Sequence, residues 1–347
     1  MACEQFRDKT LYLITDRHMR RYFSGADVDE GLMLTGEKNI YFTDARYYYA
    51  AKSAMRSEVE TRLYKSFGDV VDAVRECGAE RVGLDYAHTT LYEYEKYKTI
   101  GVELFDGTAD LVKKRYVKTE EEISYIQKAC SIAERAYRTA IKSLKTGITE
   151  KQLKSVIERQ IKNLGGEGAS FETIVAFGEN SAVPHHRSGN ASLTEDVPVL
   201  IDMGALYKGY CSDLTRTAFY GQPTEKFIKC YSAVLEANET AENGISYGMK
   251  SFEADALARN VLKKYGLEKN FTHSLGHGVG LEIHEFPVLS PSTGDCLEDG
   301  ATFTVEPGVY FDGEFGIRIE DTVVLEKGKV RRLFTDDKKL LIIKNQT

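Results

Sequence analysis

Residues 271–321 concentrate side chains that can bind metal ions or move protons. The stretch contains His273, His277, His284 and Arg318, together with the carboxylates Glu306 and Glu320. These residues stand among glycines and short β-branched runs rather than on the polar face of a helix. Imidazole and carboxylate groups presented in this way are typical ligands of divalent cations. The stretch therefore predicts part of a metal site.

Two aspartates in an earlier segment, residues 199–217, fit the same interpretation. Apolar and β-branched residues flank a polar centre there, which predicts a β-hairpin. With the turn centred on Tyr207 and Lys208, Asp202 and Asp213 would lie directly opposite each other, with their Cβ atoms ~5 Å apart. Like charges so placed destabilise a sheet, so a bound cation is the expected reason for them.

Residues 304–320 repeat this arrangement, with a turn at residues 312–314. That turn sets Glu306 opposite Glu320, and Arg318 points to the same sheet face as Glu320 because side chains alternate along a strand. The two hairpins together direct four carboxylates inward, and burying them unpaired would be prohibitively costly. Two divalent cations would neutralise them formally.

His277, between Gly276 and Gly278, is the natural neutral fifth ligand, and the glycines are expected to let the backbone approach the ions. Oxygen-rich ligation with one imidazole suits Mn²⁺, with Co, Zn or Fe as alternatives. Taken singly, an aspartate in a strand or a histidine beside glycine is more often structural. The matched hairpins make a shared site for two metal ions the better interpretation.

Strand and helix patterns alternate through residues 1–112, which predicts an α/β domain with a mixed sheet. The expected strands are residues 31–34, 39–43, 58–64, 81–85 and 102–105, and the expected helices are residues 46–55, 67–77 and 89–98. Asp44 is interpreted as part of the turn before the first of these helices. No glycine in this half belongs to a G-x-G-x-x-G phosphate-binding loop.

The second part of the chain, residues 113–347, begins with a basic run over 113–118 that we interpret as a solvated linker. Capping boxes at Thr119 and Thr149 predict the first two helices that follow. The expected helices are residues 119–147, 149–166, 224–245 and 251–265. A strand is expected at residues 171–177, and one of the two hairpins follows each helix pair. The order helix–helix–strands occurs twice, which predicts an α+β domain with internal pseudo-symmetry.

Composition and charge argue against several functions for this chain of 347 residues. A net charge of −7 gives no electrostatic support for binding nucleic acid or an anionic membrane. No window is apolar enough for a membrane span, and residues 1–23 lack the apolar core of a signal peptide. The six cysteines are dispersed without a C-x-x-C pair, which favours free thiols and a cytoplasmic location.

Several motifs together resemble the pita-bread metallopeptidases, and within them the Xaa-Pro aminopeptidase and prolidase branch. These motifs are Ile201-Asp202-Met-Gly204, Cys211-Ser-Asp213-Leu-Thr-Arg216-Thr217, His273-Ser-Leu-Gly-His277-Gly-Val-Gly280, Glu282-Ile-His284-Glu285, Val305-Glu306-Pro-Gly308 and Gly316-Ile-Arg318-Ile-Glu320-Asp321. In the first half, the motif Phe42-Thr-Asp44-Ala-Arg46-Tyr47 resembles the creatinase-type N-terminal domain. The resemblance implies a creatinase-like α/β domain over residues 1–112 and a pita-bread catalytic domain with pseudo-two-fold symmetry over residues 113–347.

The resemblance also implies a role for each matching residue. Asp202 would chelate one metal ion, Asp213 and Glu320 would bridge both ions, and His277 and Glu306 would hold the second. Glu306 would in addition handle the proton of the attacking water. Other residues would surround the metals. His284 would stabilise the tetrahedral intermediate, and His273 and Arg318 would orient groups of the site or substrate. His185 would be the family's site histidine, with the adjacent His186 as the alternative.

The activity implied by the resemblance is hydrolysis of the Xaa-Pro bond at the N-terminus of small proline-containing peptides by a hydroxide that bridges two metal ions. In some dipeptidases of the branch an arginine follows His-Glu-aromatic-Pro, whereas Val288 follows here, which favours an aminopeptidase. The alternatives are a Xaa-Pro dipeptidase with the same mechanism, a non-catalytic peptide-binding module, a metal-free creatinase-like hydrolase and a methionine aminopeptidase. The resemblance further implies a homodimer.

Overall fold

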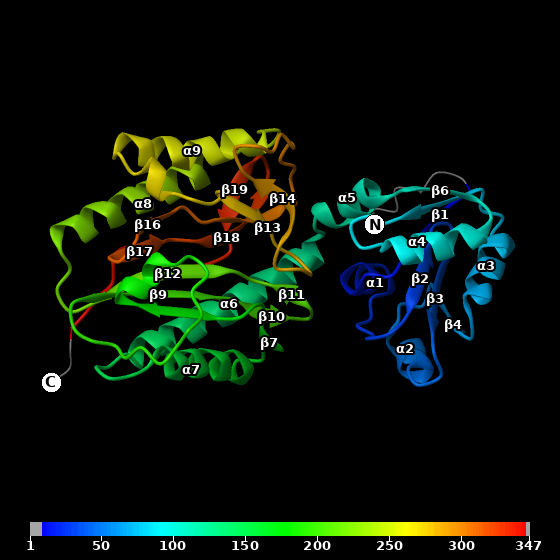
Figure 1. The fold of residues 1–347 in the computed structure, drawn as a ribbon, viewed down its shortest axis with the longest axis horizontal. Helices are drawn as coiled ribbons and strands as arrows, with labels where there is room; N and C mark the ends of the chain where they lie inside the picture. The colour runs from blue at the N-terminus through cyan, green and yellow to red at the C-terminus, as the bar shows by residue number, and fades with distance from the viewer. Residues whose placement is uncertain (1–8, 345–347) are drawn as a thin grey trace. The chain divides into compact units, whose positions relative to one another are not determined.

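The chain folds into two compact units that meet between Arg115 and Tyr116 in the structure, a computed structural model that describes residues 9–344 (Figure 1). The interpretation of residues 113–118 as a solvated linker is wrong. Residues 113–115 belong to helix α5 (Thr108–Tyr116), and both Arg115 and Lys118 are buried. Leu111 and Arg115 are one helical turn apart, so both lie on the buried face of α5.

The first unit is built on a mixed sheet, as the sequence predicted. Its six strands lie in the order β4-β3-β2-β1-β5-β6, with parallel pairing at both edges and antiparallel pairing of β2 with β1 and β3. The elements are β1 (Thr10–Ile14), α1 (Arg17–Ser24), β2 (Leu32–Thr35), β3 (Asn39–Thr43), α2 (Tyr48–Ala54), β4 (Val59–Leu63), α3 (Phe67–Glu76), β5 (Arg81–Leu84), α4 (Leu91–Tyr97) and β6 (Glu103–Asp106). The sequence analysis missed β1 and α1. Asp44 forms the turn before α2, where its side chain accepts a hydrogen bond from the backbone of Arg46.

Two pairs of helices frame the second unit. They are α6 (Glu120–Lys142) with α7 (Glu150–Asn163), and α8 (Glu225–Gly244) with α9 (Ser251–Lys264). The predicted capping boxes at Thr119 and Thr149 are both present. Helix α6 ends at Lys142 rather than at Gly147, because Ser143 already terminates its hydrogen-bond ladder. The observed element order therefore repeats helix–helix–strands, as expected.

The strands of the second unit lie between the two helix pairs (Figure 1). One sheet has the order β20-β12-β9-β8, and the other has the order β14-β13-β15-β18-β19. The strands are β7 (Gly168–Ala169), β8 (Ile174–Phe177), β9 (Val197–Met203), β10 (Ala205–Tyr207), β11 (Tyr210–Cys211), β12 (Leu214–Tyr220), β13 (Gly276–Gly278), β14 (Glu285–Leu289), β15 (Thr302–Val305), β16 (Gly308–Phe311), β17 (Phe315–Arg318), β18 (Asp321–Glu326), β19 (Lys329–Arg332) and β20 (Ile342–Ile343). Each helix pair packs its apolar face onto one of these sheets through a separate hydrophobic cluster, which gives the pseudo-symmetric pita-bread arrangement.

The register of the first hairpin differs from the predicted one. Asp202 pairs with Thr215 rather than with Asp213. The reason is the turn: Lys208 and Gly209 occupy its two central positions, with φ angles of 48° and 77°, so the centre lies one residue later than predicted. Two positive φ angles are the signature of a tight type I′ turn. Asp213 is two residues from Thr215, so it still shares the sheet face of Asp202.

The register of the second hairpin agrees with the prediction. Phe311 pairs with Phe315 around Gly313, and Val305 pairs with Asp321 further along. The same register places Glu306 across from Glu320, at the break where strands β15 and β16 are separated by Pro307.

The cysteines form no disulfide among the described residues. Cys77, Cys130, Cys211, Cys230 and Cys296 are all free thiols. The sixth, Cys3, lies outside the residues that the structure describes.

Candidate active site

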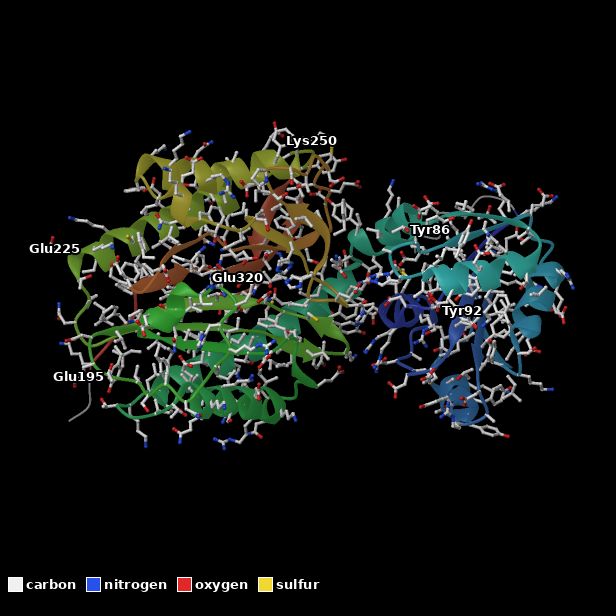
Figure 2. All side chains as sticks on the ribbon, in the orientation of Figure 1. Tyr86, Tyr92, Glu195, Glu225, Lys250 and Glu320 are labelled. Carbon is white, nitrogen blue, oxygen red and sulfur yellow. The ribbon has the colours of Figure 1, made fainter. Side chains whose placement is uncertain are left out.

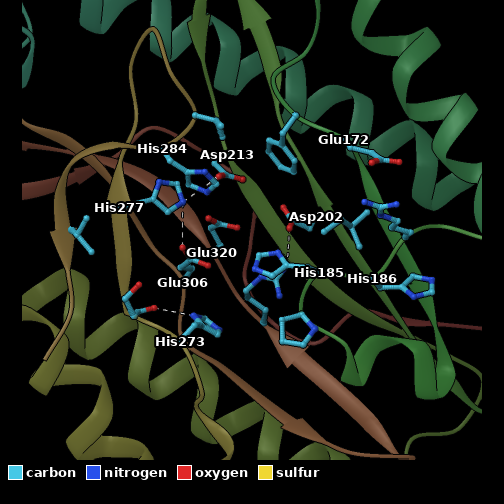
Figure 3. Close-up of a pocket in the computed structure, with 18 residues that line it drawn as sticks. Glu172, His185, His186, Asp202, Asp213, His273, His277, His284, Glu306 and Glu320 are labelled. Atoms are coloured by element: carbon cyan, nitrogen blue, oxygen red, sulfur yellow. Dashed lines mark hydrogen bonds and ion pairs between the residues drawn. The ribbon is translucent and has the colours of Figure 1, made fainter. Parts of the chain in front are cut away.

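All of the residues singled out in the sequence line one cavity of about 600 Å³ in the second unit (Figure 3). They come from strand ends and adjoining loops: His185, His186, Asp202, Asp213, His273, His277, His284, Glu306, Arg318 and Glu320. Figure 2 shows Glu320 in the interior of the unit, whereas Glu195, Glu225 and Lys250 project from its surface. The cavity therefore brings together two hairpins that are about a hundred residues apart in the chain.

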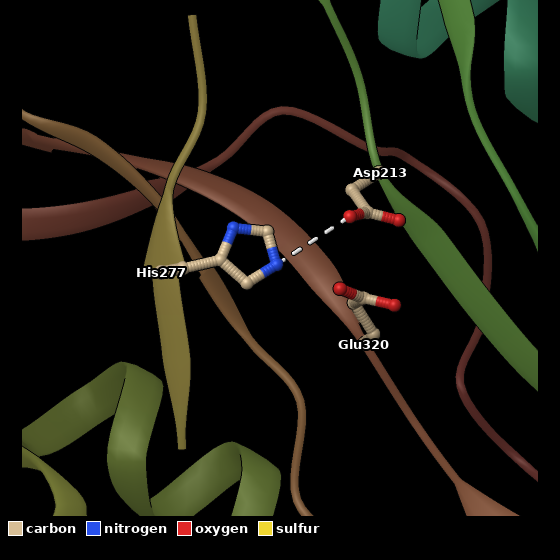
Figure 4. Close-up of side chains that lie close together, drawn as sticks. All are labelled: Asp213, His277 and Glu320. Atoms are coloured by element: carbon tan, nitrogen blue, oxygen red, sulfur yellow. Dashed lines mark ion pairs between the residues drawn. The ribbon is translucent and has the colours of Figure 1, made fainter. Parts of the chain in front are cut away.

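Asp213, His277 and Glu320 form the closest group of potential ligands. One ligand atom from each lies within 4.8 Å of the others (Figure 4). His277 Nε2 is 3.7 Å from Asp213 Oδ2 and 3.4 Å from Glu306 Oε1. These separations are too long for direct hydrogen bonds, and they leave room for an ion between the groups.

Burial and mutual repulsion make the carboxylates of this group hard to ionise. Loss of solvent, and then the neighbouring carboxylates, raise the pKa values of Asp213 and Glu320 well above the ordinary range. Burial likewise raises the pKa of Glu306 to about 8. A positive charge between these groups would offset both costs and hold the carboxylates ionised at neutral pH.

His277 is held as a neutral imidazole with one nitrogen directed at the carboxylates. Burial, followed by the neighbouring His284, lowers the pKa of His277 to about 4. Its Nδ1 lies 3.1 Å from the carbonyl oxygen of Gly278, which fixes the proton on that nitrogen. The lone pair of Nε2 is then free to bind a metal ion.

The glycines beside His277 serve the packing of strands rather than an approach to ions. A Cβ added to Gly276 would lie 2.0 Å from the carbonyl oxygen of Thr304 on β15. A Cβ on Gly278 would lie 2.2 Å from the carbonyl oxygen of Phe286 on β14. Both separations are far below van der Waals contact, so only glycine allows β13 to lie between these two strands.

The donor set fits two divalent cations. Asp202 Oδ1 and Asp213 Oδ1 are buried oxygens without a hydrogen-bond partner among the described residues. Unpartnered buried carboxylate oxygens are costly unless a cation takes up their charge. Together with Glu306, Glu320 and one neutral imidazole, they form an oxygen-rich set suited to Mn²⁺ and its neighbours.

Arg318 organises the opposite side of the cavity. Its Nη2 donates to Asp202 Oδ2 at 2.7 Å, its Nη1 donates to the hydroxyl of Tyr310 at 2.7 Å, and its Nε donates to Thr215 Oγ1 at 3.1 Å. The same Tyr310 hydroxyl lies 3.0 Å from His273 Nε2. His273 and Arg318 are thus linked through a tyrosine that the sequence analysis did not single out.

Two threonines, also missed in the sequence, hold the glutamates. Thr215 Oγ1 donates to Glu320 Oε2 at 2.5 Å, and Thr304 Oγ1 donates to Glu306 Oε1 at 3.2 Å. Each threonine stands two residues from a predicted ligand at the end of its strand, Thr215 from Asp213 just before β12 and Thr304 from Glu306 just after β15, so the side chains are directed to the same face. This alternation was the signal that could have revealed them.

The structure separates His185 from His186. His186 Nε2 lies 2.9 Å from Glu150 Oε2, on a carboxylate that also accepts hydrogen bonds from Asn180 and from two backbone amides. His185 lies within the cavity, near Asp202 (Figure 3). Burial lowers the pKa values of the neighbouring His273 and His284. His186 therefore belongs to a loop-fixing network around Glu150.

Comparison with known proteins identifies the chain as a two-domain metallopeptidase. Residues 124–327 match the metallopeptidase family M24, and residues 7–117 match the creatinase/prolidase N-terminal domain. The chain belongs to metallopeptidase family M24. A search of its described residues finds no helix long and apolar enough to cross a bilayer.

Relatives and solved structures cover nearly the whole chain. A Xaa-Pro dipeptidase from Pyrococcus furiosus is 36% identical over 324 residues, or 92% of each chain. The structure of a Xaa-Pro dipeptidase from Bacillus anthracis aligns with a TM-score of 0.91 at 34% identity, covering 96% of this chain and 95% of that one. An X-Pro aminopeptidase from Thermotoga maritima aligns with a TM-score of 0.90 at 32% identity and the same coverage.

Proposed function

We propose that this enzyme hydrolyses the peptide bond between an N-terminal residue and proline. The observation that carries the proposal is the buried group of Asp202, Asp213, His277, Glu306 and Glu320, with its two unpartnered aspartate oxygens. Relatives named Xaa-Pro dipeptidase and X-Pro aminopeptidase, which span more than nine-tenths of the chain, support the substrate class.

The five residues of this group would hold two divalent cations. When bound, such ions lower the pKa of a shared water and polarise a substrate carbonyl. This chemistry suits the Xaa-Pro bond, because a tertiary amide lacks the N–H that many peptidases hold.

The side chains around the cavity would supply the proton transfers and the charge stabilisation. Glu306 takes the proton of the attacking water and delivers it to the proline nitrogen as that group leaves. His284, whose ring centre lies 4.3 Å from that of His277, stabilises the oxyanion that develops on the carbonyl. His273 and Arg318, joined through Tyr310, keep Asp202 in place.

His185 is the site histidine under this proposal. Both histidines line the cavity, but the ring of His186 is bonded to the buried Glu150. From its position, His185 would bind the substrate rather than a metal ion.

Different residues of the cavity favour longer peptides and dipeptides as the substrate. Val288 lines the cavity where an arginine would favour dipeptides, which supports an aminopeptidase. Arg187 lines the same cavity and offers a cation to the carboxylate of a dipeptide. Because relatives of both names match over the same length, a Xaa-Pro dipeptidase with the same mechanism is the second candidate.

The test compares metal-depleted with Mn²⁺-loaded enzyme. Hydrolysis of Ala-Pro and Ala-Pro-Xaa is measured, with Ala-Ala-Xaa as the control peptide. We expect no turnover without metal, restored turnover with Mn²⁺ and no cleavage of the control peptide. Faster cleavage of Ala-Pro-Xaa than of Ala-Pro identifies an aminopeptidase, and the reverse identifies a dipeptidase. Binding of metal and peptide without hydrolysis under any first-row metal would instead favour a non-catalytic module.

Four finer expectations belong to this proposal. Mn²⁺ is the proposed ion because the donor set is rich in oxygen. The homodimer and the cytoplasmic location come from the family resemblance and from the dispersed free cysteines. Small proline-containing peptides remain the proposed partners, with no role for nucleic acid or membrane.

A further inference from the structure

A buried group of charged side chains contacts the backbone that carries Glu306 and Glu320. Two of its members, Asp336 and Lys338, come from the C-terminal segment that follows β19. Each reaches the active-site strands through one intermediary, Arg216 for Asp336 and Asn238 for Lys338. We call these four residues the C-terminal clamp.

The first half of the clamp holds the backbone at Glu320. Asp336 accepts two hydrogen bonds from Arg216, each of 2.8 Å, in a bidentate pair. The Nη1 of Arg216 donates to the carbonyl oxygens of Glu320 at 2.5 Å and of Thr215 at 3.0 Å. Arg216 therefore binds the main chain at Glu320 and at Thr215, the threonine that donates to the Glu320 carboxylate. Asp336 fixes the plane of the Arg216 guanidinium.

The second half holds the residues that precede the two glutamates. Lys338 Nζ donates to Asn238 Oδ1 at 2.5 Å and to Glu242 Oε2 at 2.6 Å. The amide nitrogen of Asn238 donates to the carbonyl oxygens of Val305 at 2.8 Å and of Ile319 at 3.2 Å. Because Asn238 is fully buried, the bond from Lys338 also fixes which way its amide faces.

The clamp adjoins a buried ion-pair network centred on Asp321. Asp321, next to Glu320, lies 2.7 Å from Arg216, 3.3 Å from Arg332 and 3.3 Å from Lys338. Charged hydrogen bonds in such a water-excluded place are strong and strongly directional. Hydrogen bonds from Arg216 and Asn238 fix four backbone carbonyl oxygens at or near Glu306 and Glu320. They therefore constrain where the carboxylates of these two glutamates can lie.

We propose that Asp336 and Lys338 are positioning residues for the metal-binding carboxylates, acting through Arg216 on Glu320 and through Asn238 on Glu306 and Glu320. Both residues lie outside the part of the chain that matches family M24, residues 124–327. The inference rests on the proposed function for the identity of the ligands. It assigns to the C-terminal segment a role in metal affinity.

The test is calorimetric titration of Mn²⁺ into full-length, metal-depleted enzyme carrying Asp336→Asn or Lys338→Met. Partners of metal ligands typically contribute 10- to 100-fold to metal affinity, so we expect about that loss in each variant. Asp337→Asn and Lys339→Met are matched controls, because the side chains of these neighbours are 68% and 83% exposed and their ion pair is long, at 3.7 Å. The Oδ1 of Asp337 accepts a hydrogen bond from the backbone of Lys339, and asparagine keeps that acceptor. The controls should bind Mn²⁺ as the unaltered enzyme does.

A second readout separates positioning from a general loss of structure. With an Xaa-Pro peptide, the Mn²⁺ concentration for half-maximal activity should rise in both variants while KM at saturating Mn²⁺ stays unchanged. Unaltered Mn²⁺ affinity in either variant, or loss of the native circular dichroism spectrum in both, overturns the proposal. Unaltered enzyme that binds Mn²⁺ but cleaves no Xaa-Pro peptide counts against the proposed function alone, because the calorimetric comparison still decides this inference.

Discussion

At the scale of single residues, Asp213 shows why the chemistry of the site favours a cation. It is buried, its pKa is raised by loss of solvent and by Glu320, and its Oδ1 has no hydrogen-bond partner among the described residues. Its backbone, by contrast, is held firmly, because Thr322 Oγ1 both accepts from the amide and donates to the carbonyl of Asp213. The backbone of Asp213 is therefore fixed in position, while Oδ1 of its carboxylate is available to bind a cation.

Asp213→Asn should therefore weaken the coupling between metal binding and stability. Ligands that bind only the folded state raise the melting temperature by mass action. We expect Mn²⁺ to raise the melting temperature of the unaltered enzyme clearly and that of the variant much less, as measured by differential scanning fluorimetry. Asp196→Asn, at an exposed aspartate outside the cavity, is the control. An equal rise in Asp213→Asn would refute its role as a bridging ligand.

At the scale of elements, the loop that carries His284 is anchored by a buried ion pair. Lys118 Nζ donates to Glu285 Oε1 at 2.5 Å and to the carbonyl oxygen of Tyr116 at 3.2 Å. The side chains of Lys118 and Glu285 are only 2% and 8% exposed. The segment before α6 is thus tied to the first residue of β14, directly after His284.

Lys118→Met should destabilise the enzyme strongly. Removing one partner of a buried pair leaves the other charge uncompensated and typically costs about 3–5 kcal/mol. In a unit of this size, such a loss lowers the melting temperature by on the order of 10 °C. Adding Glu285→Gln should recover part of the loss, because the buried carboxylate that lost its pairing with Lys118 is then replaced by a neutral amide.

The matched control for this prediction is Lys113→Met, since Lys113 is exposed on α5 and belongs to the same basic run. Exposed substitutions of this kind usually change stability by less than about 0.5 kcal/mol. Equal melting temperatures for Lys118→Met and Lys113→Met would show that the ion pair contributes nothing to stability.

At the scale of the whole molecule, the cavity makes the metal-free enzyme sensitive to pH. Burial raises the pKa of Glu306 to about 8 in the folded state, against an ordinary value of 4.5. Between these values the unfolded chain is ionised while the folded chain stays protonated, so stability falls as pH rises and levels off above about pH 8. The lowered pKa values of His273 and His277 make stability depend on pH only below the ordinary histidine value of 6.5. These histidines therefore contribute little to the pH dependence above pH 7.

We therefore expect the chelator-treated enzyme to lose stability between pH 7 and pH 8, by up to about 1.4 kcal/mol for each carboxyl group of raised pKa. Chemical denaturation at the two pH values measures this loss. Glu306→Gln removes one titrating group and should reduce the slope. With saturating Mn²⁺ the trend should reverse, because protons compete with the ion for the same oxygens. A flat profile without metal would contradict the raised pKa values.

The sequence alone determined most of the local structure, and the candidate site residues that it proposed line one cavity. Capping boxes at Thr119 and Thr149, the two hairpins and the repeated order of helices and strands all follow from short windows of residue types. The carboxylates Glu306 and Glu320 were placed opposite each other because one turn fixes their register. These features could be predicted because their causes are local: a cap, a turn or an alternation acts over a few residues.

Only the tertiary structure decided which groups meet. The turn at Lys208 and Gly209 moved the pairing partner of Asp202 from Asp213 to Thr215, two residues along the strand, because the turn centre lies one residue later than predicted. Arg318 and Asp202 are 116 residues apart, and Arg216 and Asp336 are 120 apart. Such contacts depend on how sheets and helix pairs pack over their whole length, and no short window of sequence contains that information. For the same reason the partners supplied by Tyr310, Thr215 and the C-terminal segment emerged only from the folded chain.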